Sequence, residues 1–306
     1  MAKSPRFWSN AALSFREEKV LSGFAKQEAT MSNSLFEIVQ LKSGVNSLKL
    51  IANNETFHPG IGPIAEANIL HVLQHRFSER ASVDKTFILW DVGLGAAANA
   101  IAAIDAFKEL GRPLQLHSFD RSLGALVFAL AHPKELGYPT PYKHELEALI
   151  ADGFVRVTEY ITWHLHLGDF GETMTGDLPS PHSIFYDPYS PRGNVDMWNL
   201  EHFSRLKACL DPSRPCLMSN YSRSTYVRVT WLLAGFFVGT GTAIGEKEET
   251  SLAATHLSEL LTPLPKTWLN RVKISHSSAP LRGSIYALGP IEADDYAALL
   301  DLPQFV

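Results

Sequence analysis

The chain has 306 residues, of which 45% are hydrophobic and 19% charged, and its formal net charge is −5. This composition supports a sizeable core and excludes a largely disordered chain. The acidic balance also excludes a protein that coats nucleic acid non-specifically, although it leaves room for one local basic face. The two cysteines, Cys209 and Cys216, form no C-x-x-C pair and no disulfide framework, so we expect a reducing, cytoplasmic compartment.

The N-terminal third is expected to form an extension and then a helix. Residues 1–34 are polar and mixed, which predicts a loose lead-in with some helix. Residues 35–50 alternate around Gly44-Val45-Asn46 and predict a hairpin, followed by a loop over residues 55–63. Pro63 is placed to open a helix that runs to about Phe77. No apolar run reaches the roughly 18 residues of a membrane span, so no membrane association is expected.

From residue 86 onward, predicted strands alternate with predicted helices. The strands are expected at 86–90, 114–119, 154–157, 161–167, 183–186 and 216–219, and a final strand pair over 236–244. The helices are expected at 96–110, 123–131, 145–150, 196–209 with Asp196 as N-cap, and 225–233. This alternation predicts an α/β fold with a Rossmann-like, mostly parallel, doubly wound sheet. Residues 250–306 are rich in proline and are expected to form an irregular extension.

Carboxylates recur where the predicted strands end. Asp91, Asp120 and Asp187 each follow a strand directly, and Asp169 follows the strand over 161–167. In open α/β sheets, ligands bind beyond the carboxyl ends of the strands. Several carboxylates on one edge repel each other unless the site gains from them. A ligand with hydroxyl groups, amino groups or positive charge would account for the pattern.

The segment Asp91-Val92-Gly93-Leu94-Gly95 predicts a tight turn that passes close to a ligand. An acid ahead of the glycines is typical of S-adenosylmethionine sites, whereas a dinucleotide fold uses a G-x-G-x-x-G turn. Asp120 is placed to accept from ribose hydroxyls, which both cofactors carry, or to cap the helix after it. Asp169 could bond an adenine amino group with Phe170 packing on the ring, or it could cap a helix.

The segment Phe185-Tyr186-Asp187-Pro188-Tyr189-Ser190-Pro191 carries the most chemical information. Asp187 directly follows a buried strand, and prolines stiffen the loop that begins there. Tyr189 in this loop offers a stacking face for a flat base or amine. Asp187 can orient an amine and stabilise the cation that forms when the amine takes a methyl group. This arrangement resembles the D-P-P-Y signature of amino-methyltransferases.

Other chemistries lack their motifs in this sequence. There is no G-x-S-x-G nucleophile elbow and no G-x-x-x-x-G-K-[ST] phosphate loop. His164 and His166 alternate on one predicted strand near Asp169, but histidines on one face of a strand are usually structural. We therefore expect no metal site.

The order of these elements resembles one family, the methyltransferase half of the MnmC-like bifunctional tRNA 5-methylaminomethyl-2-thiouridine biosynthesis proteins. The matching elements are Asn54-Glu55-Thr56, Asp91 to Gly95 with Asn99, His117-Ser118-Phe119-Asp120, Gly168-Asp169, Tyr186 to Pro191, and Asn194-Val195-Asp196-Met197-Trp198. The last two elements are the most specific, and the resemblance covers roughly residues 35 to 245.

The resemblance implies a class I S-adenosyl-L-methionine-dependent methyltransferase that methylates the aminomethyl group of 5-aminomethyl-(2-thio)uridine at the tRNA wobble position. By match, Asp187 and Tyr189 would be catalytic. The residues expected to line the cofactor are Glu55, Glu66, Asp91, Gly93, Gly95, Asn99, Asp120, Asp169 and Phe170. We expect residues 1–62 to be an N-terminal extension, 63–249 the methyltransferase domain, and 250–306 an extension packed on that domain.

Three departures from the family pattern bear on these expectations. One glycine of the cofactor turn is replaced within Ala96-Ala97, and Pro188 stands where the family has glycine. The FAD-dependent oxidase half is not present in this sequence, so another enzyme is expected to supply the amine. The alternatives are a methyltransferase of another amine or small molecule, a nucleotide-fold oxidoreductase, and a cofactor-binding protein without catalysis.

Overall fold

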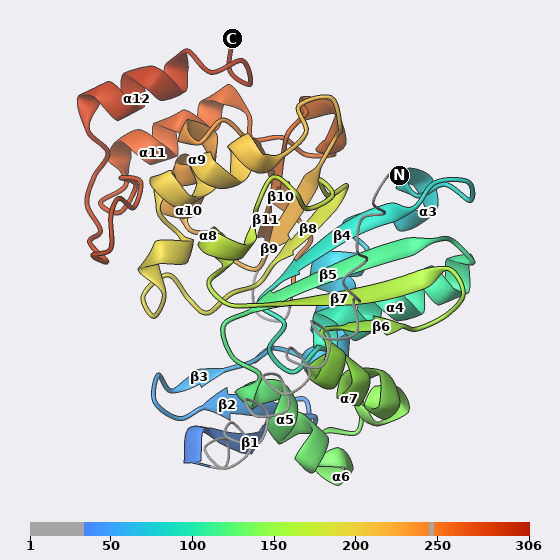
Figure 1. Ribbon diagram of the computed structural model, residues 1–306. Helices are drawn as coiled ribbons and strands as arrows, with labels where there is room; N and C mark the ends of the chain where they lie inside the picture. The colour runs from blue at the N-terminus through green and yellow to red at the C-terminus, as the bar shows by residue number, and fades with distance from the viewer. Residues whose placement is uncertain (1–33, 245–247) are drawn as a thin grey trace, which may run out of the picture.

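The computed structural model describes residues 34–244 and 248–306, so the expected lead-in over residues 1–34 lies almost wholly outside the described residues. An eight-stranded sheet forms the centre of the molecule, with the strand order β10-β11-β9-β8-β4-β5-β7-β6 (Figure 1). The strands are β4 (Phe87–Val92), β5 (Leu114–Asp120), β6 (Phe154–Arg156), β7 (Ile161–Leu167), β8 (Ser183–Tyr186), β9 (Leu217–Asn220), β10 (Phe237–Gly241) and β11 (Thr250–Ala254).

Five central strands, β7, β5, β4, β8 and β9, pair in parallel, whereas β6 and β11 pair in antiparallel register. This arrangement confirms the predicted Rossmann-like, mostly parallel sheet. Every residue of β4 is buried, because both faces of the sheet are covered by helices. Leu89 packs into the cluster under α4 and α7, and its neighbour Trp90 packs into the cluster under α9 and α10.

The helices fill the connections between the strands (Figure 1). They are α2 (Pro63–Ala67), α3 (Phe77–Arg80), α4 (Ala98–Leu110), α5 (Gly124–Ala131), α6 (Pro133–Leu136), α7 (Lys143–Asp152), α8 (Phe170–Thr173), α9 (Leu200–Cys209), α10 (Thr225–Leu233), α11 (Leu269–Ile274) and α12 (Ala293–Leu300). The single-turn 3-10 helices are η2 (Thr140–Tyr142), η3 (Val195–Met197), η4 (Leu257–Glu259) and η5 (Lys266–Trp268). No helix within 34–244 and 248–306 is both long enough and apolar enough to cross a membrane.

The expected N-terminal hairpin is present and packs beside α5. Strands β1 (Phe36–Gln40) and β2 (Asn46–Leu50) pair in antiparallel register, and a short third strand, β3 (Glu55–Thr56), pairs with β2 where we expected a loop. Phe36 and Leu48 share a small apolar cluster with Phe128 of α5, which fixes the hairpin against the main domain.

The helix predicted from Pro63 to Phe77 is divided into shorter pieces. Pro63 opens α2 as expected, and a π-helix, η1 (Asn68–Val72), follows it directly. A π-helical turn is wider than an α-helical one and often occurs at functional sites. This turn carries His71, which is fully buried, and His75 follows four residues later.

Two predictions in the C-terminal half were wrong. Residues 236–244 do not form a strand pair, because β10 pairs instead with β11, which lies in the segment expected to be irregular. Strand β11 has no alternation of polar and apolar residues, and all five of its residues are buried because it lies between β9 and β10. Asp196 does not cap α9. It belongs to η3, and Asn199 caps α9 by accepting a hydrogen bond from the backbone N–H of His202 at 2.8 Å.

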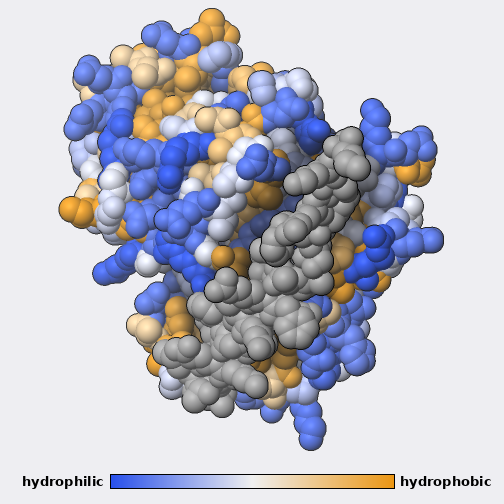
Figure 2. Space-filling model, in the orientation of Figure 1, coloured by the Kyte–Doolittle hydropathy of each residue, from blue (hydrophilic) through white to orange (hydrophobic). Residues whose placement is uncertain are grey.

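The C-terminal residues after β11 are more regular than predicted. Helices α11 and α12 pack on the cluster under α9 and α10 through buried residues such as Val272 and Leu299. The visible surface of this region carries hydrophobic residues among hydrophilic ones (Figure 2), and Ile274 and Ile285 are each 77% exposed.

Candidate active site

A cavity of about 680 Å³ opens at the carboxyl ends of β4, β5 and β8. This volume is within the usual range for small-molecule sites. Its walls come from β3 and the loop after it, the glycine turn after β4, the end of β5 and the loop after β8. Of the predicted site residues, Glu55, Glu66, Gly93, Gly95, Asn99, Asp120, Phe170, Asp187 and Tyr189 line this cavity.

The glycine turn lies directly against the segment that carries Asp187. Gly93 has a φ of 95°, and a Cβ added there would lie 2.6 Å from the carbonyl oxygen of Asp187. Only glycine therefore allows this approach. The backbone N–H of Gly95 donates to Asp120 Oδ2 at 2.9 Å, which ties the turn to the end of β5.

Ala97 stands in the glycine turn in a backbone conformation that favours glycine. Ala97, the third position of the turn, takes the left-handed conformation with φ 66° and ψ 16°. An L-residue pays roughly 1–2 kcal/mol for that conformation. The side chain of Ala97 is fully buried, and the burial of its methyl group offsets part of this cost. The turn thus keeps the conformation that a glycine there would favour.

Asp187 directly follows β8, its side chain is 16% exposed, and it lines the cavity. Its Oδ2 accepts a hydrogen bond from Asn99 Nδ2 at 2.8 Å and lies 3.8 Å from His71 Nε2. Burial alone would raise the pKa of this carboxyl, but the contact with His71, the nearby His58 and the Asn99 amide lower it overall. Asp187 is therefore an anion at neutral pH.

The loop after β8 is held by Glu55 of β3. Glu55 Oε1 accepts from the Ser190 backbone N–H at 2.8 Å, and Oε2 accepts from the Ser190 hydroxyl at 3.3 Å. Trp198 Nε1 donates to the Tyr189 carbonyl at 2.9 Å. The Tyr189 ring packs edge-on against Phe57, with the centroids 5.6 Å apart, and burial raises the pKa of its hydroxyl. Tyr189 is thus a neutral, fixed aromatic wall.

Glu66 also lines the cavity with a carboxylate that binds backbone groups. Its Oε1 accepts from the N–H groups of Gly60 and Ile61, the latter at 2.9 Å. Glu55 and Glu66 therefore shape the loops on this side of the cavity, and their contacts with the chain occupy much of their acceptor capacity.

Asp91 and Asp169 do not line the cavity. Asp91 is fully buried, accepts from the Ser118 hydroxyl at 2.8 Å, and has a pKa that burial raises to about 8. It supports the glycine turn as a neutral group. Asp169 caps α8 by accepting from the Gly171 N–H at 2.8 Å. Burial opposes ionisation of Asp169, but its ion pair with Arg121 lowers its pKa overall.

Several residues near the reactive carboxylate were not singled out from the sequence. His58 lines the cavity from the loop after β3, and Tyr221 lines it from the end of β9. His71, in the π-helical turn, lies with its Nε2 3.8 Å from Asp187 Oδ2. The four-residue spacing of His71 and His75 was the available signal, because residues four apart share a helix face.

The strand histidines form a stack. The His117 ring lies 4.7 Å from that of His164 and 5.1 Å from that of His166, and His117 Nδ1 is 2.8 Å from His166 Nε2. In the part of the chain that the structure describes, no group of three or more His, Cys, Asp or Glu residues is arranged to hold a metal ion.

The cavity fits S-adenosyl-L-methionine by its chemistry. Gly93 lets the glycine turn pack directly against the backbone of Asp187, so the turn and the carboxylate line one space. Carboxylates from two strand ends, Asp120 and Asp187, face one space, which suits a ligand with hydroxyl groups and positive charge. Phe170 offers an apolar face on the same side as Asp120.

Comparisons with known proteins agree with this chemistry. A family described as S-adenosyl-L-methionine-dependent methyltransferase matches residues 141–256. The structure of MnmC2 from Aquifex aeolicus is similar over 87% of this chain and 84% of that chain, with a TM-score of 0.65 and 25% identity. Spermidine synthase from Thermotoga maritima matches over 88% of this chain and 81% of that chain, with a TM-score of 0.46 and 11% identity. No curated protein matches by sequence.

The family match over residues 141–256 and the similarity to MnmC2 identify the chain as an S-adenosyl-L-methionine-dependent methyltransferase. Within that class it is similar to MnmC-like methyltransferases, as the sequence motifs around Asp187 predicted.

Proposed function

We propose that this methyltransferase transfers a methyl group to the aminomethyl nitrogen of 5-aminomethyl-(2-thio)uridine at the tRNA wobble position. One observation carries the proposal. An anionic carboxylate, Asp187, faces the cavity from the strand end that touches the cofactor turn, and an aromatic wall, Tyr189, lies two residues later. An amine on a flat base needs both an acceptor for its N–H and a face for its ring.

The cofactor contacts follow from the cavity walls. We assign Gly93 and Gly95 to the backbone turn that receives the aminoacyl end, Asp120 to the ribose hydroxyls, and Phe170 to the adenine face. Asp120 Oδ2 accepts from the Gly95 N–H at 2.9 Å and its Oδ1 accepts from the Ser122 N–H at 3.1 Å, so the carboxylate is held in a fixed orientation at the cavity. We assign Asn99 to the orientation of Asp187, which its amide contacts directly.

When bound, S-adenosyl-L-methionine supplies a methyl group that the positive sulfur activates. The chain itself has two tasks. Asp187 accepts an N–H of the acceptor amine, which turns the nitrogen lone pair toward the cofactor end of the cavity. As the nitrogen gains positive charge, the same carboxylate stabilises it. Both tasks require an ionised Asp187, and its lowered pKa meets that requirement.

The tRNA part of the proposal is supported by the MnmC-like resemblance and only modestly by charge. Arg121 lines the cavity rim but is paired with Asp169, and Arg192 is exposed beside the cavity-lining Gly193. Lys and Arg at a rim bind phosphates, and each such contact adds to the salt dependence of binding. The small rim suits recognition of one anticodon loop more than extended contact with tRNA.

A direct assay distinguishes the acceptors. The purified chain is incubated with methyl-labelled S-adenosyl-L-methionine and, in parallel, tRNA that carries 5-aminomethyl-uridine, the free modified nucleoside, and tRNA without the aminomethyl group. The proposal predicts that the tRNA with 5-aminomethyl-uridine is labelled, and that the free modified nucleoside is labelled far less or not at all. Label in the free nucleoside at equal efficiency would favour a small-molecule methyltransferase. Cofactor binding without label in any acceptor would favour a non-catalytic protein.

A further inference from the structure

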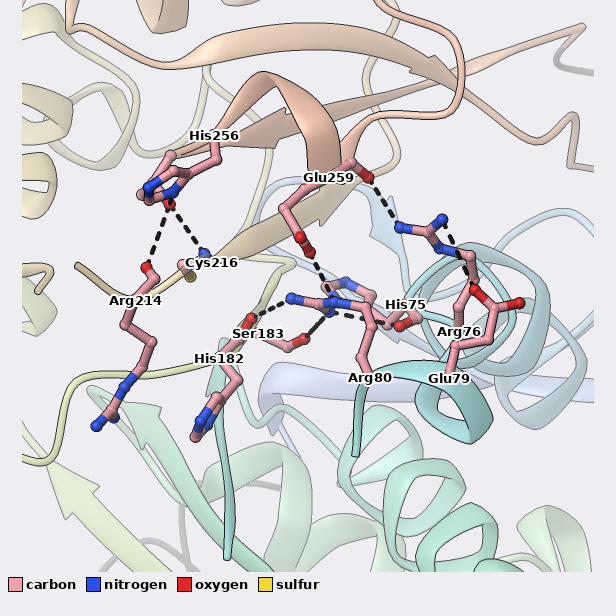
Figure 3. A network of polar contacts seen from close by, with 11 residues as sticks. His75, Arg76, Glu79, Arg80, His182, Ser183, Arg214, Cys216, His256 and Glu259 are labelled. Atoms are coloured by element: carbon pink, nitrogen blue, oxygen red, sulfur yellow. Dashed lines mark hydrogen bonds and ion pairs between the residues drawn. The ribbon is translucent and has the colours of Figure 1, made fainter. Parts of the chain in front are cut away.

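A row of hydrogen-bonded polar side chains leads from an ion pair at the amino end of β8 to the candidate catalytic carboxylate. Arg80 of α3 pairs with Glu259 at 2.8 Å, and its Nη1 donates to the Ser183 hydroxyl at 2.8 Å (Figure 3). His75 Nδ1 lies 2.7 Å from the same hydroxyl (Figure 3). His75 Nε2 then meets the Ser219 hydroxyl at 2.8 Å, and that hydroxyl meets His71 Nδ1 at 2.7 Å.

The sheet places these groups in one line. Ser183, Phe185 and Asp187 are alternate residues and so project to one side of β8. Ser219 of β9 lies beside Phe185 in the parallel register. The His71 ring stacks on Phe185 with the centroids 4.6 Å apart, between the serines and Asp187. The wide π-helical turn brings His71 and, four residues on, His75 onto this row.

Only one direction of hydrogen bonding gives the hydrogen of each serine hydroxyl in this row an acceptor. Arginine has donors and no acceptor, so the Ser183 oxygen must accept from Arg80. Ser183 then has its own hydrogen to donate, and among the described residues His75 Nδ1 is the acceptor within reach. A neutral His75 that accepts at Nδ1 carries its proton on Nε2 and donates to Ser219. Ser219 in turn donates to His71 Nδ1, which leaves the proton of His71 on Nε2.

Both histidines are neutral for physical reasons. His75 and His71 are fully buried, and burial lowers the pKa of each ring. The positive charge of Arg80 lowers the pKa of His75 further. An imidazolium at either position would carry an extra donor, and Ser183 or Ser219 would then face a donor where the chain needs an acceptor.

This row of hydrogen-bonded side chains ends at a ring nitrogen that has no hydrogen-bond partner among the described residues and faces the active site. His71 Nε2 is buried, has no hydrogen-bond partner among the described residues, and lies 3.8 Å from Asp187 Oδ2. A buried N–H without a partner costs roughly 1–3 kcal/mol. A shift of under about 1 Å would bring the pair to hydrogen-bond length.

We propose that Arg80, Ser183, His75 and Ser219 act as positioning residues that fix the proton of His71 on Nε2, where it points at Asp187 and holds the carboxylate as an oriented anion. The inference rests on the proposed role of Asp187 in amine methylation. The Arg80–Glu259 pair sets the direction of the chain because a guanidinium cannot accept a hydrogen bond. Asn99 and His71 then both donate to Oδ2, and the other carboxylate oxygen is left for the acceptor amine.

The first test reads the proton position without any substrate. Two-bond proton–nitrogen correlation spectra of the histidine-labelled protein distinguish the Nδ1–H form, the Nε2–H form and the imidazolium. We expect the Nε2–H form for His71 and His75 from pH 6 to 8, with the signals assigned by loss in His71→Leu and His75→Gln. An Nδ1–H form or an imidazolium at His71 would overturn the inference. This result does not depend on which acceptor the enzyme uses.

The second test interrupts the chain away from the cavity. Ser219→Ala removes the hydroxyl between the two rings, so His71 is free to carry its proton on Nδ1 and turn an acceptor toward Asp187. We expect the acid limb of the pH–rate profile to move up by about one pH unit, as the loss of one charge-assisted hydrogen bond gives. The affinity for S-adenosyl-L-methionine should stay within about threefold of wild type.

The groups that face Asp187 and His71 from the surrounding elements are His58, His75, Asp91, Asp120 and Tyr221. Ser219→Ala substitutes none of them, although His75 loses its hydrogen bond to the Ser219 hydroxyl. Ser278→Ala is the matched control, because Ser278 is equally buried and bonds the Val272 carbonyl in the C-terminal region. It should lower the melting temperature to a similar extent without moving the acid limb.

The outcomes separate this inference from the proposed function. An inactive wild-type protein with an Nε2–H His71 would refute the proposed function but leave the proton arrangement standing. An active Ser219→Ala variant with an unshifted acid limb and an unchanged His71 spectrum would overturn the inference and leave the role of Asp187 intact. Equal shifts of the acid limb in Ser219→Ala and Ser278→Ala would show that these hydrogen-bonded side chains have only a structural role, and would overturn the inference.

Discussion

Asp187→Asn tests the reactive carboxylate without disturbing its surroundings. The amide keeps the size of the side chain, and its oxygen can still accept from Asn99 at 2.8 Å and face His71 Nε2 at 3.8 Å. Its NH₂ group then faces the cavity, where the carboxylate oxygen had been. The free energy of unfolding should therefore change by about 1 kcal/mol or less.

The effect on catalysis should be much larger. An amide N–H cannot accept a hydrogen from the acceptor amine and does not stabilise the positive nitrogen that forms. Removal of one such transition-state contact costs about 3–4 kcal/mol, which is a hundredfold to a thousandfold in rate. The affinity for S-adenosyl-L-methionine should stay within about tenfold, as it should in Asp187→Ala.

The assay is a single-turnover measurement of labelled methyl transfer, with calorimetric titration of the cofactor alongside. Asp187→Ala is the companion variant. It leaves the Asn99 and His71 donors without an acceptor, so it should lose stability by roughly 1–3 kcal/mol as well as rate. Turnover of Asp187→Asn within a few-fold of wild type would show that the carboxylate is not at the reacting amine. A loss of cofactor affinity equal to the loss of rate would move Asp187 to the cofactor contacts.

Three further predictions concern the cofactor side. Asp120→Ala should weaken S-adenosyl-L-methionine binding with little change in the rate at saturation, because ribose contacts are equal in ground and transition states; a pure rate effect in calorimetry and kinetics would contradict this. Gly93→Ala should lose cofactor binding and roughly 1–3 kcal/mol of stability, because its Cβ would lie 2.6 Å from the Asp187 carbonyl oxygen. Gly111→Ala, with a φ of 61° and no atom within 4 Å of the added Cβ, is the control and should lose only about 1 kcal/mol; equal binding losses would refute the role of Gly93. Asp91 has a folded pKa of about 8 against 3.8 in a free chain, so the folded state binds the extra proton and stability falls as pH rises between those values. Asp91→Asn removes that dependence and should gain on wild type between pH 5 and 7 by up to about 1.4 kcal/mol per pH unit in chemical denaturation; parallel curves would show that Asp91 is ionised.

The elements that could be predicted are those with strong local signals. The apolar run 183–186 and the helix 225–233 were predicted with the same ends that the structure shows, because polar or turn-forming residues flank each one. Strand β11 was missed because Thr250–Ala254 has no alternation and only one bulky hydrophobic residue, Leu252. It becomes a strand only between β9 and β10, with the buried Arg228 donating to the Thr250 carbonyl at 2.9 Å.

In the candidate site, too, some residues could be predicted from the sequence and others could not. Asp120 and Asp187 follow strands, and the geometry of a parallel sheet brings such residues together at one edge. Asp91 follows the same rule, but its side chain turns into the core toward Ser118, and the sequence does not show which way a strand-end carboxylate turns. The His71 contact was not foreseeable, because its partners Ser219 and Asp187 are more than 100 residues away in the chain and meet it only through sheet register.

The measurement that tests the central claim most directly is transfer of a labelled methyl group to tRNA. The wild-type chain, labelled S-adenosyl-L-methionine and tRNA bearing 5-aminomethyl-uridine are combined, and the wobble nucleoside is isolated and weighed by mass spectrometry. The account predicts one added methyl group on the aminomethyl nitrogen and none in Asp187→Asn over the same time. A wobble nucleoside left unmethylated by a protein that binds the cofactor would contradict it.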